Sequence, residues 1–164
     1  MARPLSLVLL FLLLAAAAFL RLHAIDRHGL WIDEANSVLI ADRDVPGVIE
    51  GLRNDANPPV YYLLLHYWIA VFGDGERAVR ALSVLFGVML VALLYFAGAA
   101  IHGPRAGLFA AAVCALHPLQ IYNSQTARMY TLLPVLALLS LWLLDRAVTK
   151  GGRVRWAGYA FVTA

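Results

Sequence analysis

Long apolar runs, separated by short polar segments, dominate the chain. The first covers 5–22, and a run of this length is about enough for one helix to cross the hydrocarbon core of a bilayer. Later runs cover 81–101, 107–123 and 129–145, and another begins at 156. The pattern predicts an all-α, polytopic transmembrane helical bundle with spans at about these positions.

The first run also has a second interpretation. Arg3 precedes it and small alanines occupy 15–18, a pattern that also fits a cleaved signal peptide. The run is long for the apolar core of a signal peptide, and further apolar spans follow it. The first run is therefore better explained as a membrane span.

The segment 23–80, between the first two spans, is rich in acidic residues. It contains nine of the ten Asp and Glu residues of the chain. Within it, 34–41 and 45–53 have a loose helical periodicity that is typical of short helices lying on a membrane surface. We therefore expect 23–80 to form an outer loop that carries juxtamembrane helices.

A further helix is predicted at 58–72. Asn57-Pro58-Pro59 indicates its start, because Asn is a good N-cap and proline suits the first helical turn. Gly73 marks its end. Such a helix is only about 20–25 Å long, so we expect it to lie along the membrane surface and not to cross it.

Composition agrees with a membrane protein. The 164 residues are 62% hydrophobic and 14% charged, whereas a soluble domain has about 45–50% apolar and about 25% charged residues. The basic residues do not form a face interleaved with aromatics, so no nucleic-acid partner is expected. The histidines and the single cysteine, Cys114, show no metal-ligand spacing. The sequence therefore indicates no cofactor and no tightly bound metal.

The orientation follows from lysine and arginine, which favour the cytoplasmic side in short loops. Basic residues mark 1–3, 102–105 and 146–155. These three segments share one side of the membrane only if the juxtamembrane helix does not cross. We therefore expect a cytoplasmic N-terminus, with the acidic loop 23–80 and the turn 125–128 together on the outer face.

The first candidate for chemistry is the pair Asp33-Glu34, just past the first span. A carboxylate at this position could remove a proton from an attacking hydroxyl, and desolvation beside Leu30 and Trp31 would raise its pKa towards a useful range. The structural alternative is that Asp33 caps a surface helix and Glu34 favours its first turn. The residues alone leave both interpretations open.

The second candidate covers 55–62. Asn57 lies at the predicted helix start, and Tyr61 and Tyr62 lie beside it. A helix N-terminus can bind a phosphate through its free N–H groups. Interfacial tyrosines are also common in membrane proteins without any such role.

The third candidate covers 122–130, a polar stretch between two apolar runs that contains Gln125, Arg128 and Tyr130. Arginine can pair with a phosphate through two parallel hydrogen bonds. It can also simply extend towards the membrane interface. The residues do not decide between these two roles for Arg128.

Five strings taken in order carry a resemblance to a known family: 29–35 (GLWIDEA), 57–66 (NPPVYYLLLH), 72–73 (FG), 80–87 (RALSVLFG) and 124–130 (SQTARMY). Each is weak, but five in order at plausible spacing are fairly specific. Over nearly all of 1–146 the chain resembles the N-terminal half of the GT-C membrane glycosyltransferases. It is most similar to the bacterial branch near the protein O-mannosyltransferases and the lipid A aminoarabinose transferases.

The resemblance implies an enzyme of the bacterial inner membrane, of which this chain is the N-terminal part. Such an enzyme transfers a sugar from a polyprenyl-phosphate carrier to a hydroxyl of a protein, lipid or glycan on the outer face, usually with inversion. It makes Asp33 the favoured base and Glu34 its neighbour, and it places Arg128 near the donor phosphate. The further donor- or substrate-binding residues that it implies are Asn57, Tyr61, Tyr62, Gln125 and Tyr130.

Two positions depart from the pattern of the family. Many relatives have His or Lys where Asn57 stands, and many bacterial relatives have Glu where Thr126 stands. The charges that those relatives carry at the two positions are absent from this chain.

Two other classes of membrane protein are alternatives to an enzyme: a transporter fragment and a structural membrane subunit. Transporters place their binding groups near the midplane, on broken helices. Here the polar residues gather at one interface, apart from His117-Pro118 and Pro134. This distribution favours an enzyme that works at the membrane surface.

Overall fold

The computed structural model describes residues 3–53 and 57–163, and every regular element in them is a helix. In chain order the helices are α1 (Arg3–Leu22), α2 (Ile32–Ala41), α3 (Val45–Gly51), α4 (Pro59–Phe72), α5 (Glu76–His102), α6 (Pro104–Leu116), α7 (Pro118–Ser124), α8 (Leu132–Lys150) and α9 (Arg153–Thr163). The predicted all-α fold is confirmed.

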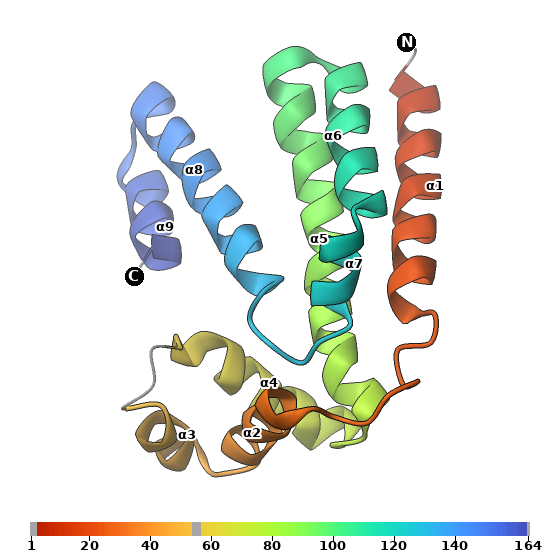
Figure 1. The fold of residues 1–164 in the computed structure, drawn as a ribbon. Coiled ribbons are helices and arrows are strands. Elements are labelled where there is room, and N and C mark those ends of the chain that lie inside the picture. Colours follow the sequence, from red (N-terminus) through yellow and green to blue (C-terminus); the bar gives the residue numbers. More distant parts are fainter. Residues whose placement is uncertain (1–2, 54–56, 164) are drawn as a thin grey trace.

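The long helices form a bundle with a group of short helices at one end (Figure 1). Among the described residues, α1, α5 and α8 are long and apolar enough to cross a membrane. The axes of α1, α5 and α6 run side by side, and α8 leaves them at an angle. The short helices α2, α3 and α4 gather where α1 ends and α5 begins, whereas the N-terminus, the α5–α6 turn and the end of α8 lie at the opposite end. The fold is a helical membrane bundle.

The juxtamembrane helix α4 begins and ends close to its predicted bounds, but its N-cap is not the predicted one. The cap position is Pro58, in extended conformation, and Pro59 is the first helical residue. A residue that precedes proline is restricted to extended conformations, so Pro58 takes the cap position and Asn57 lies one residue outside it. At the other end, Gly73 adopts a φ of 83° and its amide bonds the carbonyl of Ile69, a conformation that glycine adopts at no steric cost.

The predicted span 107–123 is divided into two helices. It falls in α6 and α7, which meet at His117, in extended conformation before Pro118. Proline has no N–H to donate to the carbonyl four residues earlier, and its ring forces the preceding residue out of the helical region. The break therefore leaves carbonyls near the end of α6 without helical partners.

The buried Arg21, in the last turn of α1, supplies hydrogen bonds at this break. Its Nη2 donates to the Cys114 carbonyl at 3.1 Å and its Nη1 to the Ala115 carbonyl at 3.0 Å, while its Nε donates to the Ser124 hydroxyl at 3.1 Å. In the absence of water, freed backbone groups within a membrane need such partners. These bonds give Arg21 a structural role in joining α1 to the break.

Glycines allow the bundle to pack tightly around α5. A Cβ added at Gly107 would overlap the Tyr95 carbonyl oxygen, and one at Gly87 would overlap the Ser124 hydroxyl and lie 3.0 Å from Nε of Arg21. Small residues at such contacts let helix backbones approach closely in membranes. Gly107 thus sets the close packing of α6 on α5, and Gly87 leaves room for Arg21.

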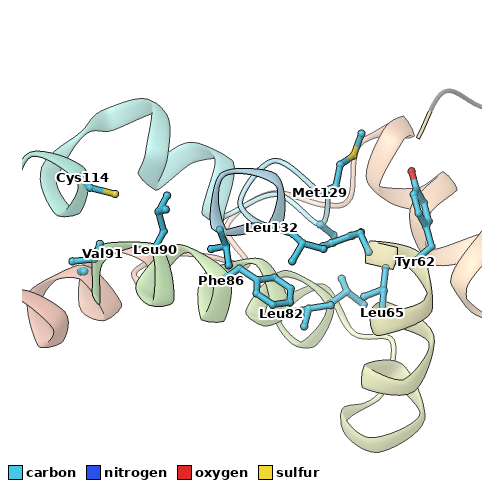
Figure 2. Close-up of a cluster of buried hydrophobic side chains, with 14 of the residues drawn as sticks. Tyr62, Leu65, Leu82, Phe86, Leu90, Val91, Cys114, Met129 and Leu132 are labelled. Carbon is cyan, nitrogen blue, oxygen red and sulfur yellow. The ribbon is translucent and has the colours of Figure 1, made fainter. Parts of the chain in front are cut away.

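The apolar core follows α5 and extends to the short helices (Figure 2). Leu82 and Phe86 of α5 lie near Leu65 of α4 at one end, and Leu90 and Cys114 lie towards the other. The same cluster includes Met129, in the segment before α8, and Leu132, the first residue of α8. The core thereby joins α4 and the segment before α8 to one face of α5, which positions the polar groups described next.

Candidate active site

The first turn of α2 presents its two acidic residues differently. The N-cap is Trp31, in extended conformation, so Asp33 lies inside the first turn and is not the cap that the structural alternative required. Glu34 is 1% exposed, whereas Asp33 is only partly buried. Two adjacent carboxylates therefore occupy different environments.

Both carboxylate oxygens of Glu34 accept hydrogen bonds from other groups of the protein. Its Oε1 accepts hydrogen bonds from Arg80 Nε at 2.9 Å and from the Ala127 amide at 2.8 Å, and its Oε2 accepts one from Arg80 Nη2 at 2.6 Å. The Trp31 amide lies 3.4 Å from the same Oε2. The two parallel bonds between Arg80 and Glu34 form a bidentate, charge-assisted pair, the strong kind of ion pair.

Arg80, from the first turns of α5, also holds the connection between α1 and α2. Its Nη1 donates to the carbonyls of Ile25 at 2.7 Å and His28 at 2.8 Å, and its Nη2 donates to that of Gly29 at 3.1 Å. All five N–H groups of a guanidinium can be satisfied in this arrangement. Nothing in the sequence analysis assigned a role to Arg80, although it begins one of the strings, 80–87, that carry the family resemblance.

The environment keeps Glu34 ionised. Burial works to raise the pKa of its carboxyl, but hydrogen bonds from Arg80 and from the Ala127 amide outweigh burial, so the pKa lies below its usual value. A carboxylate with a lowered pKa accepts a proton less readily than an ordinary one. Glu34 is therefore poorly suited to act as a base.

Arg128 lies in the segment between α7 and α8, beside the start of α2. Its Nη1 is 3.5 Å from the Asp33 carbonyl oxygen and 3.4 Å from the Tyr62 hydroxyl, and its guanidinium carbon is 5.7 Å from the centre of the Tyr130 ring. Both hydrogen-bond distances are long. Its buried Nε has no hydrogen-bond partner among the described residues. The guanidinium is thus surrounded by polar groups but is not held by a strong pair.

The charge of Arg128 is stabilised by its surroundings. Burial works to lower the pKa of the guanidinium, but the Tyr62 and Tyr130 hydroxyls and the Asp33 carboxylate outweigh it and raise the pKa. In the described part of the chain, the ion pairs are Arg53–Glu50 on the surface and Arg80–Glu34 in the interior. Arg128 belongs to neither, so no carboxylate of the described residues is in direct contact with this cation.

Tyr61 supports the segment that carries Arg128. Its buried hydroxyl lies 2.9 Å from the Ser83 hydroxyl, which donates to the Arg128 carbonyl at 3.2 Å. Burial raises the pKa of the Tyr61 phenol, which therefore stays protonated. Tyr61 consequently supports the backbone of Arg128 through Ser83, whereas Tyr62 contacts the guanidinium directly.

Gln125 faces a different part of the molecule. Its Nε2 donates to the carbonyls of Leu20, Arg21 and His23 at the end of α1, at 3.3, 3.2 and 3.0 Å. It lines a cavity of about 260 Å³ together with Trp31. The contacts that the structure describes around Arg128 do not include Gln125 or Asn57.

The structure therefore divides the predicted residues into groups. One group surrounds Arg128 and contains Asp33, Tyr62 and Tyr130. Tyr61 contacts this group indirectly, through Ser83 and the Arg128 carbonyl. Glu34 is paired with Arg80 beside it. Across residues 3–53 and 57–163, no three His, Cys, Asp or Glu side chains come close enough to hold a metal ion. Asp55 and Ala56, which the second sequence candidate included, lie outside the described residues.

This combination of fold and site defines a class: a helical membrane protein that holds a carboxylate together with an arginine that has no ion-pair partner among the described residues, at one end of its bundle. Comparison with known families narrows the class. The chain belongs to the dolichyl-phosphate-mannose-protein mannosyltransferase family, whose model matches residues 56–164. No curated protein and no solved structure matches the chain.

Family membership makes the chain part of a membrane glycosyltransferase family that uses a lipid-linked phosphate sugar as donor. The matched region contains Arg80, Tyr62, Arg128 and Tyr130. Asp33 lies before it. The role of Asp33 thus depends on the sequence resemblance and on its position beside Arg128.

Proposed function

We propose that the full-length protein transfers a sugar from a polyprenyl-phosphate donor to a hydroxyl acceptor on the outer face of a bacterial plasma membrane, with inversion. The observation that carries this proposal is the position of Arg128 next to Asp33, in no ion pair with any residue in 3–53 or 57–163. A guanidinium that is not engaged by a carboxylate is complementary in charge and geometry to a phosphate, which it can bind through two parallel hydrogen bonds. The family's lipid-phosphate donor supplies such a group.

The proposed reaction is a direct displacement at the anomeric carbon. The acceptor oxygen forms a bond to that carbon while the bond from the carbon to the phosphate oxygen breaks, and the lipid phosphate leaves with the bonding electron pair. Attack from the face opposite the leaving group inverts the configuration. Asp33 takes the proton from the acceptor hydroxyl, and Arg128 stabilises the negative charge that develops on the departing phosphate.

The division of roles between the two carboxylates follows from their contacts. Glu34 is occupied by Arg80 and by the Ala127 amide. In the described part of the chain, no hydrogen bond or ion pair holds the carboxylate of Asp33. We therefore assign the base to Asp33 and a supporting role to Glu34. Tyr62 and Tyr130 are proposed to line the phosphate site beside Arg128.

Transfer by the full-length protein in lipid vesicles is the direct test. With labelled polyprenyl-phosphate sugars, label should leave the carrier lipid and appear on a hydroxyl-bearing acceptor, with the free lipid phosphate as the second product. Label that crosses the vesicle membrane without leaving its carrier would favour the transporter alternative. Absence of both binding and transfer, with a panel of such donors, would favour a structural subunit.

The site is proposed to lie on the outer face, with the N-terminus in the cytoplasm. The arrangement of the ends of the bundle supports this orientation. The basic segments 102–105 and 146–155 lie near the end of the bundle at which α1 begins, and helices α2 to α4 lie at the opposite end (Figure 1). Basic residues in short loops favour the cytoplasmic side.

Cysteine labelling in intact cells tests this topology. In a Cys114→Ala background, cysteines replacing the exposed Asp44 and Asp74 should both react with an impermeant reagent. Those replacing the exposed Arg105 and Lys150 should react only after permeabilisation. If α4 crossed the membrane, Asp44 and Asp74 would lie on opposite sides and only one of the two cysteines would react.

A further inference from the structure

The Glu34 carboxylate joins three separate parts of the fold. Arg80 reaches it from α5, the Ala127 amide from the segment between α7 and α8, and the Trp31 amide from its own helix start. Arg80 and Ala127 are 46 and 93 residues from Glu34 in the chain. This one side chain thereby sets the position of Asp33, the residue before it, relative to Arg128, the residue after Ala127.

Glu34 and Arg128 lie close enough for their charges to act on a common group. The Tyr61 hydroxyl experiences both, since the Glu34 carboxylate works to raise its pKa and the Arg128 guanidinium works to lower it. The cation in direct contact with the Glu34 carboxylate is Arg80, which donates to it at 2.9 and 2.6 Å. Arg80 therefore neutralises a carboxylate that lies near Arg128: the amide of Ala127, the residue before Arg128, bonds Glu34, and Arg128 lies beside the carbonyl of Asp33, the residue before Glu34.

Removal of Arg80 would leave a buried carboxylate without a counter-charge. An unpaired buried charge is strongly unfavourable and attracts any cation that can reach it. Arg128 is suited to respond, because its own hydrogen bonds are long and its Nε has no partner. A guanidinium drawn to Glu34 would no longer present its N–H groups to a phosphate.

We propose that Arg80 is a positioning residue that keeps Arg128 available for the donor phosphate by neutralising Glu34. This inference depends on the proposed function, because it takes the ligand of Arg128 to be the phosphate of a polyprenyl-phosphate donor. Arg80 does not touch the donor. It acts through Glu34, and its effect is on the affinity for the phosphate and not on the acceptance of the proton by Asp33.

The test measures binding of polyprenyl phosphate, without a sugar, to the full-length protein in lipid nanodiscs. Arg80→Gln should weaken binding about tenfold or more, the effect expected when one charge-assisted contact of about 1.5–3 kcal/mol is lost. The double variant Glu34→Gln/Arg80→Gln removes both charges and leaves amides that can still form hydrogen bonds. It should restore the affinity to within about threefold of the unmodified protein.

Arg80→Lys is the conservative control. It keeps the positive charge and loses the two-pronged geometry, so it should bind the lipid phosphate nearly normally while unfolding at a lower temperature. A purely structural Arg80 would give the opposite pattern: affinity would follow stability, and the double variant would bind no better than Arg80→Gln. Unchanged affinity in Arg80→Gln would also overturn the proposal.

A second measurement needs no ligand and separates this proposal from the proposed function. Unfolding midpoints of Glu34→Gln, Arg128→Gln and their combination are compared in the unmodified and the Arg80→Gln proteins. The two changes should be nearly additive when Arg80 is present and clearly non-additive when it is absent, because only then do Glu34 and Arg128 pair. Additivity in both backgrounds would refute the role of Arg80, whereas failure of the unmodified protein to bind polyprenyl phosphate would count against the donor assignment alone.

Discussion

Replacement of Asp33 by Asn in the full-length protein is expected to reduce turnover about a hundredfold or more, within the range of about 10²–10⁴ that a general base contributes. Asn keeps the shape and most of the hydrogen bonding of Asp but cannot take the proton of the acceptor hydroxyl. Donor binding and expression should change little. Steady-state transfer with saturating labelled donor, together with binding of the lipid phosphate, measures both quantities.

The structure makes this substitution more informative than the sequence alone did. Because the N-cap of α2 is Trp31, a loss in Asp33→Asn cannot be attributed to removal of a helix cap. Asp42→Asn, at an exposed acid just after α2, is a matched control that should retain activity. Near-normal turnover in Asp33→Asn would remove Asp33 from the mechanism. If Glu34→Gln instead lost turnover with its fold and donor affinity preserved, the base would move to Glu34.

Arg128→Lys is expected to weaken binding of the lipid-phosphate donor about tenfold or more, since hydrogen bonds to charged groups contribute about 1.5–3 kcal/mol each. Lysine keeps the charge but presents it as a single point and not as a planar fork, so it is not a conservative change at a phosphate site. The fold should be preserved, because the hydrogen bonds that the structure describes for the guanidinium of Arg128, to the Asp33 carbonyl and the Tyr62 hydroxyl, are long. Titration with polyprenyl phosphate measures the affinity.

Two further variants complete this experiment. Arg128→Ala should weaken binding more than Arg128→Lys does, because the charge is lost as well. Arg43→Lys changes an exposed arginine between α2 and α3 and should leave the affinity unaltered. Unchanged donor affinity in Arg128→Ala would mean that Arg128 only extends to the membrane interface.

Local patterns were sufficient to predict most of the helices. The predicted helices 34–41 and 58–72 correspond to α2 and α4 within a few residues, because amphipathic spacing, prolines and Gly73 are local signals. Local patterns predict helix boundaries less accurately where two of them compete, as an apolar run and a proline do. The apolar run 107–123 predicted a span, and in the structure Pro118 divides this segment into the two helices α6 and α7. The proline was visible in the sequence, and its effect on the helix outweighed the apolar pattern.

By itself the sequence determined that the chain forms apolar helices and that an acidic segment of short helices interrupts them. It also predicted, from positive-inside bias, that Asp33 and Arg128 lie on the same face of the membrane. These properties depend on composition and on neighbours a few residues apart. The tertiary structure alone decided which carboxylate is occupied. Asp33 and Glu34 are adjacent and chemically alike, and only the approach of Arg80 and the Ala127 amide to Glu34 distinguishes them. The same holds for Arg21, whose partners at the α6–α7 break lie 93 and 94 residues away. No local pattern specifies such pairs, because a buried charge is stabilised by whichever distant groups the packing of the helices brings to it.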